Sequence, residues 1–231
     1  IGWTPGINRR SVSEMVVGQM VGLSRNLFTH SALLRAGDWQ KDGGRLFSDR
    51  TVGIIGLGNI GQDLAKILQP FGCKLLGNDI LDRSVFARKH GVRLVSKEEI
   101  FYKSDIVTIH VPLTPDTRQL VNSRTLELMH DESFLINTSR GSVVDQNALK
   151  KALINGTIAG AAIDVFEEEP PTDSDFLRLP NLIPTPHLSG NSYEAVLAMG
   201  RSSIKHIEEK LDVSQSVAHS DNESTRQFAV N

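Results

Sequence analysis

The feature that most constrains this chain is the glycine pattern Gly56-Leu-Gly58-Asn-Ile-Gly61. It follows an apolar run and precedes a segment of helical periodicity, so it predicts a strand, a tight turn and a helix. Gly56 would allow the tight turn, Gly58 would let the backbone approach a pyrophosphate, and Gly61 would let the helix pack close to the sheet. The free N–H groups at the start of the helix would face the anion. The pattern therefore predicts a nucleotide site, and a purely structural turn is the alternative.

Short apolar runs alternate with helical patterns from residue 50 onward. Several of the runs are continuously apolar, which is typical of strands covered on both faces. The alternation predicts an α/β fold, a Rossmann-type doubly wound parallel sheet with right-handed crossovers. The predicted strands cover residues 51–56, 74–79, 92–95, 106–111, 133–137, 157–164 and 182–184, and the predicted helices cover residues 60–69, 82–90, 97–103, 123–129 and 145–154.

Asp79 ends the second predicted strand, 18 positions after Gly61. This spacing is close to the roughly 20 residues expected of an acid that binds the ribose of a dinucleotide. A carboxylate there accepts hydrogen bonds from the 2′- and 3′-hydroxyls and repels a 2′-phosphate, so it predicts NAD over NADP. The alternative is an aspartate that only begins a turn, and the neighbouring Arg83 could tolerate the extra phosphate.

Two of the seven histidines follow predicted strands, where open α/β sheets bind their ligands. His187 lies in the segment Pro-Thr-Pro-His-Leu-Ser-Gly, whose prolines and glycine would hold a defined turn. A histidine in this position suits proton transfer near neutral pH, and a structural, hydrogen-bonded histidine is the alternative. His110 is predicted to line the nucleotide cleft.

Arg140 follows the predicted strand at 133–137. Its guanidinium is shaped to bind a planar carboxylate at two points, and a salt bridge at the domain surface is the alternative. Asp164 ends the next predicted strand, and three further carboxylates follow at 167–169. Three adjacent acids are usual in a solvated loop, but one of them could orient a histidine, as a carboxylate does in catalytic triads. The composition of this segment does not say which.

Helical patterns flank the predicted sheet. Ser11 and Glu14 have the spacing of a capping box, and the helix that they would start runs to about Arg35. Its apolar residues surround the helix, which predicts either packing on a partner surface or an ordinary core helix. A last helix is predicted from about Tyr193 to Leu211, followed by a polar, aperiodic tail that we expect to be mobile.

The composition excludes several classes of protein. The 25 Lys and Arg residues nearly balance the 27 Asp and Glu residues, so no nucleic-acid surface is predicted. No apolar run reaches the roughly 18 residues that a membrane span requires. A single cysteine, Cys73, cannot form an internal disulfide, which fits the cytoplasm. No metal site is predicted, and we expect a chain that begins at Ile1 to be a piece of something longer.

Taken together, the motifs resemble those of the D-isomer-specific 2-hydroxyacid dehydrogenases, the family that contains D-3-phosphoglycerate dehydrogenase. Chance does not produce so many separate motifs in one order, and they span residues 3–210. The matching pieces are Thr4-Pro-Gly-x-Asn8 with Ser11-Val-x-Glu14, Gly56-x-Gly58-x-x-Gly61, Ser104-Asp105-Ile106-Val107, His110-x-Pro112-Leu-Thr114, Asn137-Thr-Ser-Arg140-Gly141, Asp164-Val-Phe-x-x-Glu169-Pro170 and Pro186-His187.

The resemblance implies a role for each residue of the site. His187 would be the general acid that protonates the keto oxygen as hydride arrives from the nicotinamide. Glu169 would pair with His187 and keep it protonated, and Arg140 would bind and polarise the carboxylate and carbonyl of a 2-keto acid. Asp164 would contact the nicotinamide carboxamide. The residues that would contact NAD are Gly56, Gly58, Asn59, Ile60, Gly61, Asp79, His110, Pro112, Thr114, Thr138, Asp164 and Gly190.

The resemblance also implies a domain organisation. Residues 50–190 would form the NAD-binding domain, 1–49 a helical arm that forms a homodimer, 191–211 a helix that returns to a substrate domain, and 212–231 a tail that matches nothing. Family members begin with a segment that forms most of the substrate domain. We expect that segment to be missing here.

The implied function is that of an NAD-dependent oxidoreductase that interconverts a small D-2-hydroxy acid and its 2-keto acid. Phosphoglycerate dehydrogenase and hydroxypyruvate or glyoxylate reductase are the activities that the resemblance suggests. The alternative is an NAD(H)-sensing binding protein, because the C-terminal binding protein corepressors share this fold and this Arg, Glu and His set. The lack of a basic patch and of a long low-complexity tail favours the enzyme.

Overall fold

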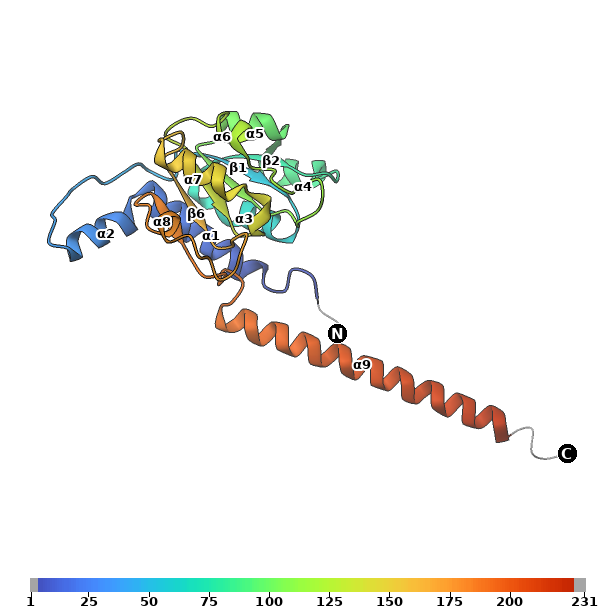
Figure 1. Ribbon diagram of the computed structural model, residues 1–231. Coiled ribbons are helices and arrows are strands. Elements are labelled where there is room, and N and C mark those ends of the chain that lie inside the picture. The colour runs from blue at the N-terminus through green and yellow to red at the C-terminus, as the bar shows by residue number, and fades with distance from the viewer. Residues whose placement is uncertain (1–3, 227–231) are drawn as a thin grey trace.

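The computed structural model describes residues 4–226, with side chains described up to Glu209. Its centre is a seven-stranded sheet in the order β3-β2-β1-β4-β5-β6-β7, with every neighbouring pair parallel (Figure 1). This is the predicted doubly wound arrangement, in which the strand order reverses between β1 and β4. The strands are β1 (Thr51–Ile55), β2 (Lys74–Asn78), β3 (Val92–Leu94), β4 (Ile106–Ile109), β5 (Phe134–Asn137), β6 (Gly160–Ile163) and β7 (Leu182–Pro184).

Helices cover both faces of the sheet (Figure 1). Adjacent strand residues point to opposite faces, so Ile54 packs in one apolar cluster and Ile55 in the other. This two-sided cover explains why the strand runs are continuously apolar. One face carries α1 (Arg9–Ser24), α3 (Asn59–Leu68) and α4 (Ser84–Lys89), and the other carries α5 (Lys97–Lys103), α6 (Ser123–Leu126) and α7 (Gln146–Ile154).

The strand predicted at 157–164 is shorter than expected, because its first residues close the preceding helix. Gly156 has a φ of +69°, and the Thr157 N–H donates to the Ala152 carbonyl at 2.9 Å, which ends α7 in a tight turn. The sequence pattern also missed a short helix, α8 (Ser174–Leu177), which Asp173 caps, and two single 3₁₀ turns, η1 (Gln69–Phe71) and η2 (Gly141–Val143).

The capping box predicted at Ser11 and Glu14 is wrong. The helix begins at Arg9, and the Ser11 hydroxyl instead donates to the Ser189 carbonyl at 2.7 Å. The single predicted helix is also two helices, because Asn26 adopts a left-handed conformation, with φ of +52°, between α1 and α2 (Leu27–Arg35). The local sequence does not indicate either difference. The use of the Ser11 hydroxyl depends on Ser189, which lies far along the chain.

Helix α1 belongs to the core of this chain, as the alternative of an ordinary core helix predicts, and packing of the opening helix on a partner surface stays a prediction. Val16 and Met20 are fully buried, in the same cluster as Leu64 of α3 and Ile54 of β1. An apolar circumference therefore reflects burial on the chain's own sheet. In contrast, α2 has no buried residue.

The last helix, α9 (Tyr193–Arg226), projects away from the body of the molecule (Figure 1). The predicted end at Leu211 is wrong, because residues 201–226 contain no proline or glycine to stop the helix. The mobility expected of the segment 212–231 stays a prediction, and residues 227–231 lie outside the described part. Among the helices of residues 4–226, none has the length and apolar character needed to cross a bilayer.

Candidate active site

A crevice opens where the strand order reverses, at the carboxyl ends of β1 and β4. Gly56 directly follows β1 and His110 directly follows β4, and the residue after β5 is Thr138. Open α/β sheets bind their ligands at this position. The cavity there has a volume of about 450 Å³, and its lining residues are Ile60, His110, Val111, Pro112, Leu113, Thr138, Ser139 and Arg140.

The glycine loop is shaped by close approaches of the backbone. Gly56 has a φ of +97°, and a Cβ there would collide with the carbonyl oxygen of His110. A Cβ on Gly61 would collide with the carbonyl oxygen of Gly56, so the start of α3 is pressed against the turn. A Cβ on Gly58 would meet no protein atom within 4 Å. Gly58 therefore faces open space, whereas Gly56 and Gly61 are enclosed by protein atoms.

The N-terminus of α3 is open to a ligand. Gly58 occupies the N-cap position, and no side chain accepts a hydrogen bond from the first N–H groups of the helix. The side chain of Asn59 lies beside Gly6: a Cβ added to Gly6 would be 2.6 Å from the Asn59 Cγ. At the start of the helix, Asn59 and Ile60 therefore offer their backbone N–H groups, and not their side chains, to a ligand. Free N–H groups at a helix N-terminus fit a pyrophosphate, and the residues present therefore fit a dinucleotide.

Asp79 ties the glycine loop to the end of β2. Its Oδ2 accepts the Leu57 N–H at 2.7 Å, and its Oδ1 accepts the Leu81 N–H at 2.8 Å. An ionised carboxylate has about four acceptor positions, so two remain for hydroxyl groups. The predicted ribose acid is thus next to the predicted phosphate loop.

Two buried polar atoms in the crevice have no partner among the described residues. They are Nδ1 of His110 and Oγ1 of Thr138, and both residues line the cavity. The other nitrogen of His110 lies 2.9 Å from the hydroxyl of Thr108. Burial lowers the pKa of His110 to about 3, so its imidazole is neutral and has one acceptor nitrogen. Unpartnered buried polar atoms are uncommon, and a ligand rich in hydroxyl and amide groups would satisfy these two.

His187 and Glu169 form a hydrogen-bonded pair. Nδ1 of His187 lies 2.8 Å from Oε2 of Glu169, and Oε1 of Glu169 accepts the Phe166 N–H at 3.0 Å. The pKa of Glu169 is lowered, first by the hydrogen bond from His187 and then by the Phe166 N–H, with a further contribution from the charge of Arg140. The side chains are 47% and 39% exposed. Because Glu169 holds Nδ1, the opposite nitrogen of His187 is left for a substrate.

Asp164 fixes the turn that carries His187. It is fully buried, and its carboxylate accepts the Thr185 hydroxyl at 2.6 Å and the N–H groups of Leu188 and Ser189 at 3.0 and 2.9 Å. The His187 N–H donates to the Asp164 carbonyl at 2.8 Å. His187 has a φ of +52°, which a side chain with a Cβ adopts rarely and which this network maintains. A contact between Asp164 and a nicotinamide stays a prediction.

Arg140 is exposed, and its Nη1 donates to the Ser139 carbonyl at 2.6 Å. Gly141 allows the loop of Arg140 to approach the His187–Glu169 pair. Any residue with a Cβ at this position would collide with the backbone of Phe166. The loop of Arg140 thus packs directly on the loop that leads to Glu169. Sequence reasoning missed this contact, although a glycine after the arginine is the signal that could have indicated it.

Three further predicted residues have mixed positions. Pro112 lines the crevice, as expected. Thr114 is exposed and is not among the lining residues, and its N–H donates to the Thr117 hydroxyl at 2.7 Å. A Cβ on Gly190 would lie 2.6 Å from the Asn8 amide nitrogen, so this glycine allows close packing against the start of α1. Cofactor contacts for Thr114 and Gly190 stay predictions.

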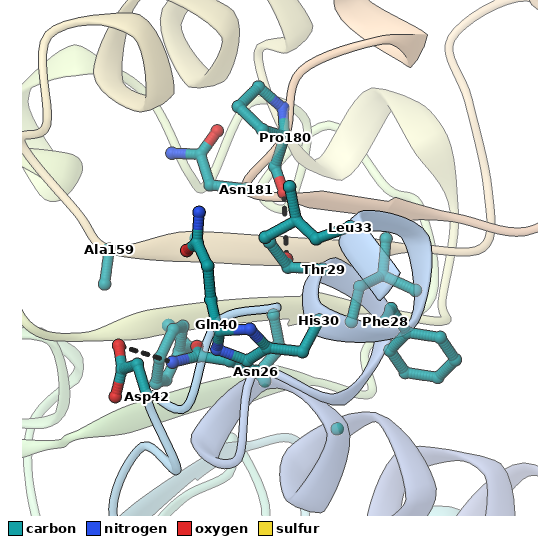
Figure 2. A pocket seen from close by; sticks show the side chains of 15 residues that line it. Asn26, Phe28, Thr29, His30, Leu33, Gln40, Asp42, Ala159, Pro180 and Asn181 are labelled. Carbon is teal, nitrogen blue, oxygen red and sulfur yellow. Dashed lines mark hydrogen bonds between the residues drawn. The ribbon is translucent and has the colours of Figure 1, made fainter. Parts of the chain in front are cut away.

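A second cavity, of about 310 Å³, lies away from these residues, between α1, α2 and the starts of β5 and β6 (Figure 2). The side chains of His30 and Gln40 line it, and the Asn26 amide donates to Asp42 at 3.3 Å. It lies at the amino ends of the strands, where this sheet type does not bind its ligands. None of the predicted site residues lines it. Among the side chains of residues 4–209, no three His, Cys, Asp or Glu groups gather as a metal site would require.

Comparison with known proteins agrees with this geometry. Residues 17–189 match the model of the family described as D-isomer specific 2-hydroxyacid dehydrogenase, NAD binding domain. This chain belongs to that family. The match contains the whole glycine loop, Arg140, Glu169 and His187, and the family's domain binds NAD.

Individual dehydrogenases of the family are similar over most of this chain. It is 39% identical to D-3-phosphoglycerate dehydrogenase of Methanocaldococcus jannaschii over 200 residues, which are 85% of the chain and 38% of that protein. It is 34% identical to hydroxypyruvate reductase of Thermotoga maritima, covering 91% of the chain and 69% of the relative. The structure of Aquifex aeolicus D-lactate dehydrogenase with NAD and lactic acid superposes with a TM-score of 0.85 at 27% identity, covering 92% of this chain and 69% of that one. The chain thus spans between 38% and 69% of the length of these relatives.

Proposed function

We propose that this dehydrogenase domain serves an enzyme that interconverts a small D-2-hydroxy acid and its 2-keto acid by NAD-dependent hydride transfer. The observation that carries the proposal is the His187–Glu169 pair, 2.8 Å apart, whose carboxylate also responds to the charge of Arg140. A proton donor and a carboxylate-binding guanidinium beside a dinucleotide crevice are the groups that the reduction of a 2-keto acid requires.

The chain's own residues would hold the cofactor as follows. The N–H groups after Gly58 would bind the pyrophosphate, and Asp79 would accept hydrogen bonds from the adenosine ribose. The unpartnered atoms of His110 and Thr138 would satisfy polar groups further along the cofactor. When bound, the cofactor would supply the hydride as NADH in the reduction and accept it as NAD⁺ in the oxidation. Asp164 would act nearby by keeping the His187 turn in place, and Pro112 would form part of the cavity wall.

Proton transfer would use the free nitrogen of His187. Glu169 stays ionised because its pKa is lowered, and a carboxylate at Nδ1 stabilises the charged imidazole. In the reduction, the charged imidazole would donate the proton on Nε2 to the keto oxygen. In the oxidation, Nε2 would accept a proton from the hydroxyl of the 2-hydroxy acid. Arg140 would bind the substrate carboxylate with the N–H groups that it does not use on Ser139.

Oxidation of NADH, followed by its absorbance, tests the proposed reaction. The substrates would be pyruvate, glyoxylate, hydroxypyruvate and 3-phosphohydroxypyruvate, assayed with this chain and with the protein that includes any residues preceding Ile1 in its gene. We expect one of these acids to be reduced. Tight NADH binding without turnover of any acid would instead favour the NAD(H)-sensing binding protein.

A matched pair of glycine variants tests the nucleotide site without an activity assay. Gly58→Ala is expected to leave the melting temperature unchanged, since the new Cβ meets no protein atom within 4 Å, but to weaken NADH binding about tenfold or more by occupying the pyrophosphate position. Gly61→Ala is expected to lower the melting temperature, because its Cβ would collide with the Gly56 carbonyl. Fluorescence titration and thermal unfolding measure both. Unaltered NADH affinity in Gly58→Ala would contradict the assignment.

A homodimer is part of the proposal. Helix α2 and the segment after it expose large apolar side chains, which a partner surface would cover: Leu27, Phe28, Leu34, Trp39 and Leu46. We expect light scattering to give about twice the mass of 25.4 kDa, and Phe28→Asp with Trp39→Asp to return the monomer mass. A monomer mass for the unmodified chain at micromolar concentration would contradict this expectation.

We also assign the protein to the cytoplasm. This assignment rests on the single cysteine, Cys73, which is half-buried and unpaired. Burial raises the pKa of the Cys73 thiol to about 11, so the thiol stays protonated at neutral pH. A protein with one cysteine and no internal disulfide does not need an oxidising compartment.

A further inference from the structure

Arg83 lies beside the proposed ribose acid, Asp79, and forms a long ion pair with it. Its Nε is 3.6 Å from Oδ2 of Asp79, which is too long for a hydrogen bond. That Nε is buried and has no hydrogen-bond partner among the described residues. A charged donor without a hydrogen-bond acceptor is costly, and the exposed part of the guanidinium can therefore take a further anionic acceptor.

Arg83 would lie next to the adenosine ribose of a bound dinucleotide. Asp79 is joined to the glycine loop by the 2.7 Å bond from Leu57, so a ribose held by Asp79 would lie within reach of Arg83. The approach is open, because Ile80 is fully exposed and the Arg83 side chain retains 25% of its exposure. The other charge in the loop is Asp82, which accepts the Ser84 N–H at 2.8 Å and whose pKa is lowered first by that bond.

We propose that Arg83 is a specificity-determining residue that binds a 2′-phosphate, so that this site accepts NADPH as well as NADH. The inference rests on the proposed nucleotide site. A lone aspartate would repel a 2′-phosphate, but here the guanidinium offsets the charge of Asp79 and supplies N–H donors suited to phosphate. Asp79 would hold the ribose, and Arg83 would make the additional phosphate tolerable.

Binding titrations with two pairs of ligands test this inference. Each pair differs only in the 2′-phosphate: NADPH against NADH, and adenosine 2′,5′-bisphosphate against AMP. For the unmodified chain we expect the NADPH dissociation constant to lie within about tenfold of the NADH value. Arg83→Ala should weaken NADPH and the bisphosphate about tenfold to hundredfold, the range of one charge-assisted hydrogen bond, and change NADH and AMP less than about threefold.

Three controls make the result specific. Arg88→Ala removes an exposed arginine from the same helix, α4, and should leave all four affinities unchanged. Arg83→Lys keeps the charge but not the planar fork, and should retain part of the NADPH affinity. Raising the salt concentration should weaken NADPH more than NADH in the unmodified chain and equally in Arg83→Ala, since salt screens the phosphate contact.

The outcomes separate this inference from the proposed function. If NADH binds but NADPH is more than about a hundredfold weaker, or if Arg83→Ala weakens both dinucleotides equally, Arg83 does not read the phosphate and the inference fails alone. If neither dinucleotide binds to a folded chain, the proposed nucleotide site fails as well. A selective loss of NADPH in Arg83→Ala, with the melting temperature retained, supports the inference.

Discussion

Replacing His187 with alanine is expected to lower the turnover of the 2-keto acid about 10²–10⁴-fold, the usual contribution of a positioned acid–base group. The imidazole would be the proton donor, and Glu169 would hold it through the 2.8 Å contact at Nδ1. NADH affinity should change less than about threefold, because the imidazole does not contact the glycine loop. Steady-state kinetics and NADH titration on the same samples measure both effects, and an unaltered turnover would remove His187 from the mechanism.

The titration of Glu169 gives a control that does not need turnover. The hydrogen bond from His187 is the largest cause of its lowered pKa, so His187→Ala should move that pKa back up toward the ordinary value of 4.5. Because the pKa of this carboxyl is lowered in the folded protein, the interaction stabilises the fold at pH values above the ordinary pKa of a glutamate. This stabilisation is lost as the pH falls through the lowered pKa. Carbon NMR of the Glu169 carboxyl should show the upward move, and an identical titration in both proteins would disprove the pairing in solution.

Arg140→Ala is expected to reduce kcat/KM about 10²–10³-fold, the usual effect of removing a donor that stabilises developing charge. Among the described residues, Arg140 donates a hydrogen bond only through Nη1, to the Ser139 carbonyl, so we expect most of the loss to come from substrate contacts. NADH binding and the melting temperature should be retained because the side chain is exposed.

The matched variant for this position is Arg140→Lys. It keeps the charge and loses the two-point geometry, so we expect it to recover less than about a tenth of the lost activity. Full recovery by lysine would mean that Arg140 acts as a point charge. Full activity in Arg140→Ala would mean that another group binds the carboxylate.

The sequence predicted those parts of the fold and site that depend on local patterns. The glycine loop and the sheet follow from periodicity and spacing, and His187 and Arg140 follow from their places after strands. Asp79 was found in the same way, and the structure adds the bond from Leu57 that sets its position.

The rest depends on contacts between distant residues. Local spacing could not select Glu169 from its two acidic neighbours, because the choice depends on the turn that brings His187 to it across 18 positions. The contact of Gly141 with Phe166 and the use of Ser11 on Ser189 likewise arise only in the folded chain. The end of α9 was missed because a polar composition resembles a tail even where nothing interrupts a helix.

The contacts of Ser11 have a consequence for the order in which the molecule forms. Its hydroxyl donates to the Ser189 carbonyl at 2.7 Å and accepts the Ser192 N–H at 3.1 Å, so the histidine turn is fastened to the first helix of the chain. These bonds join residues 178 and 181 positions apart, and contacts of such long range form late in folding because they must close a large loop. During synthesis the ribosome makes α1 before it makes the histidine turn. The turn can therefore reach its final position only after almost the whole domain has been made.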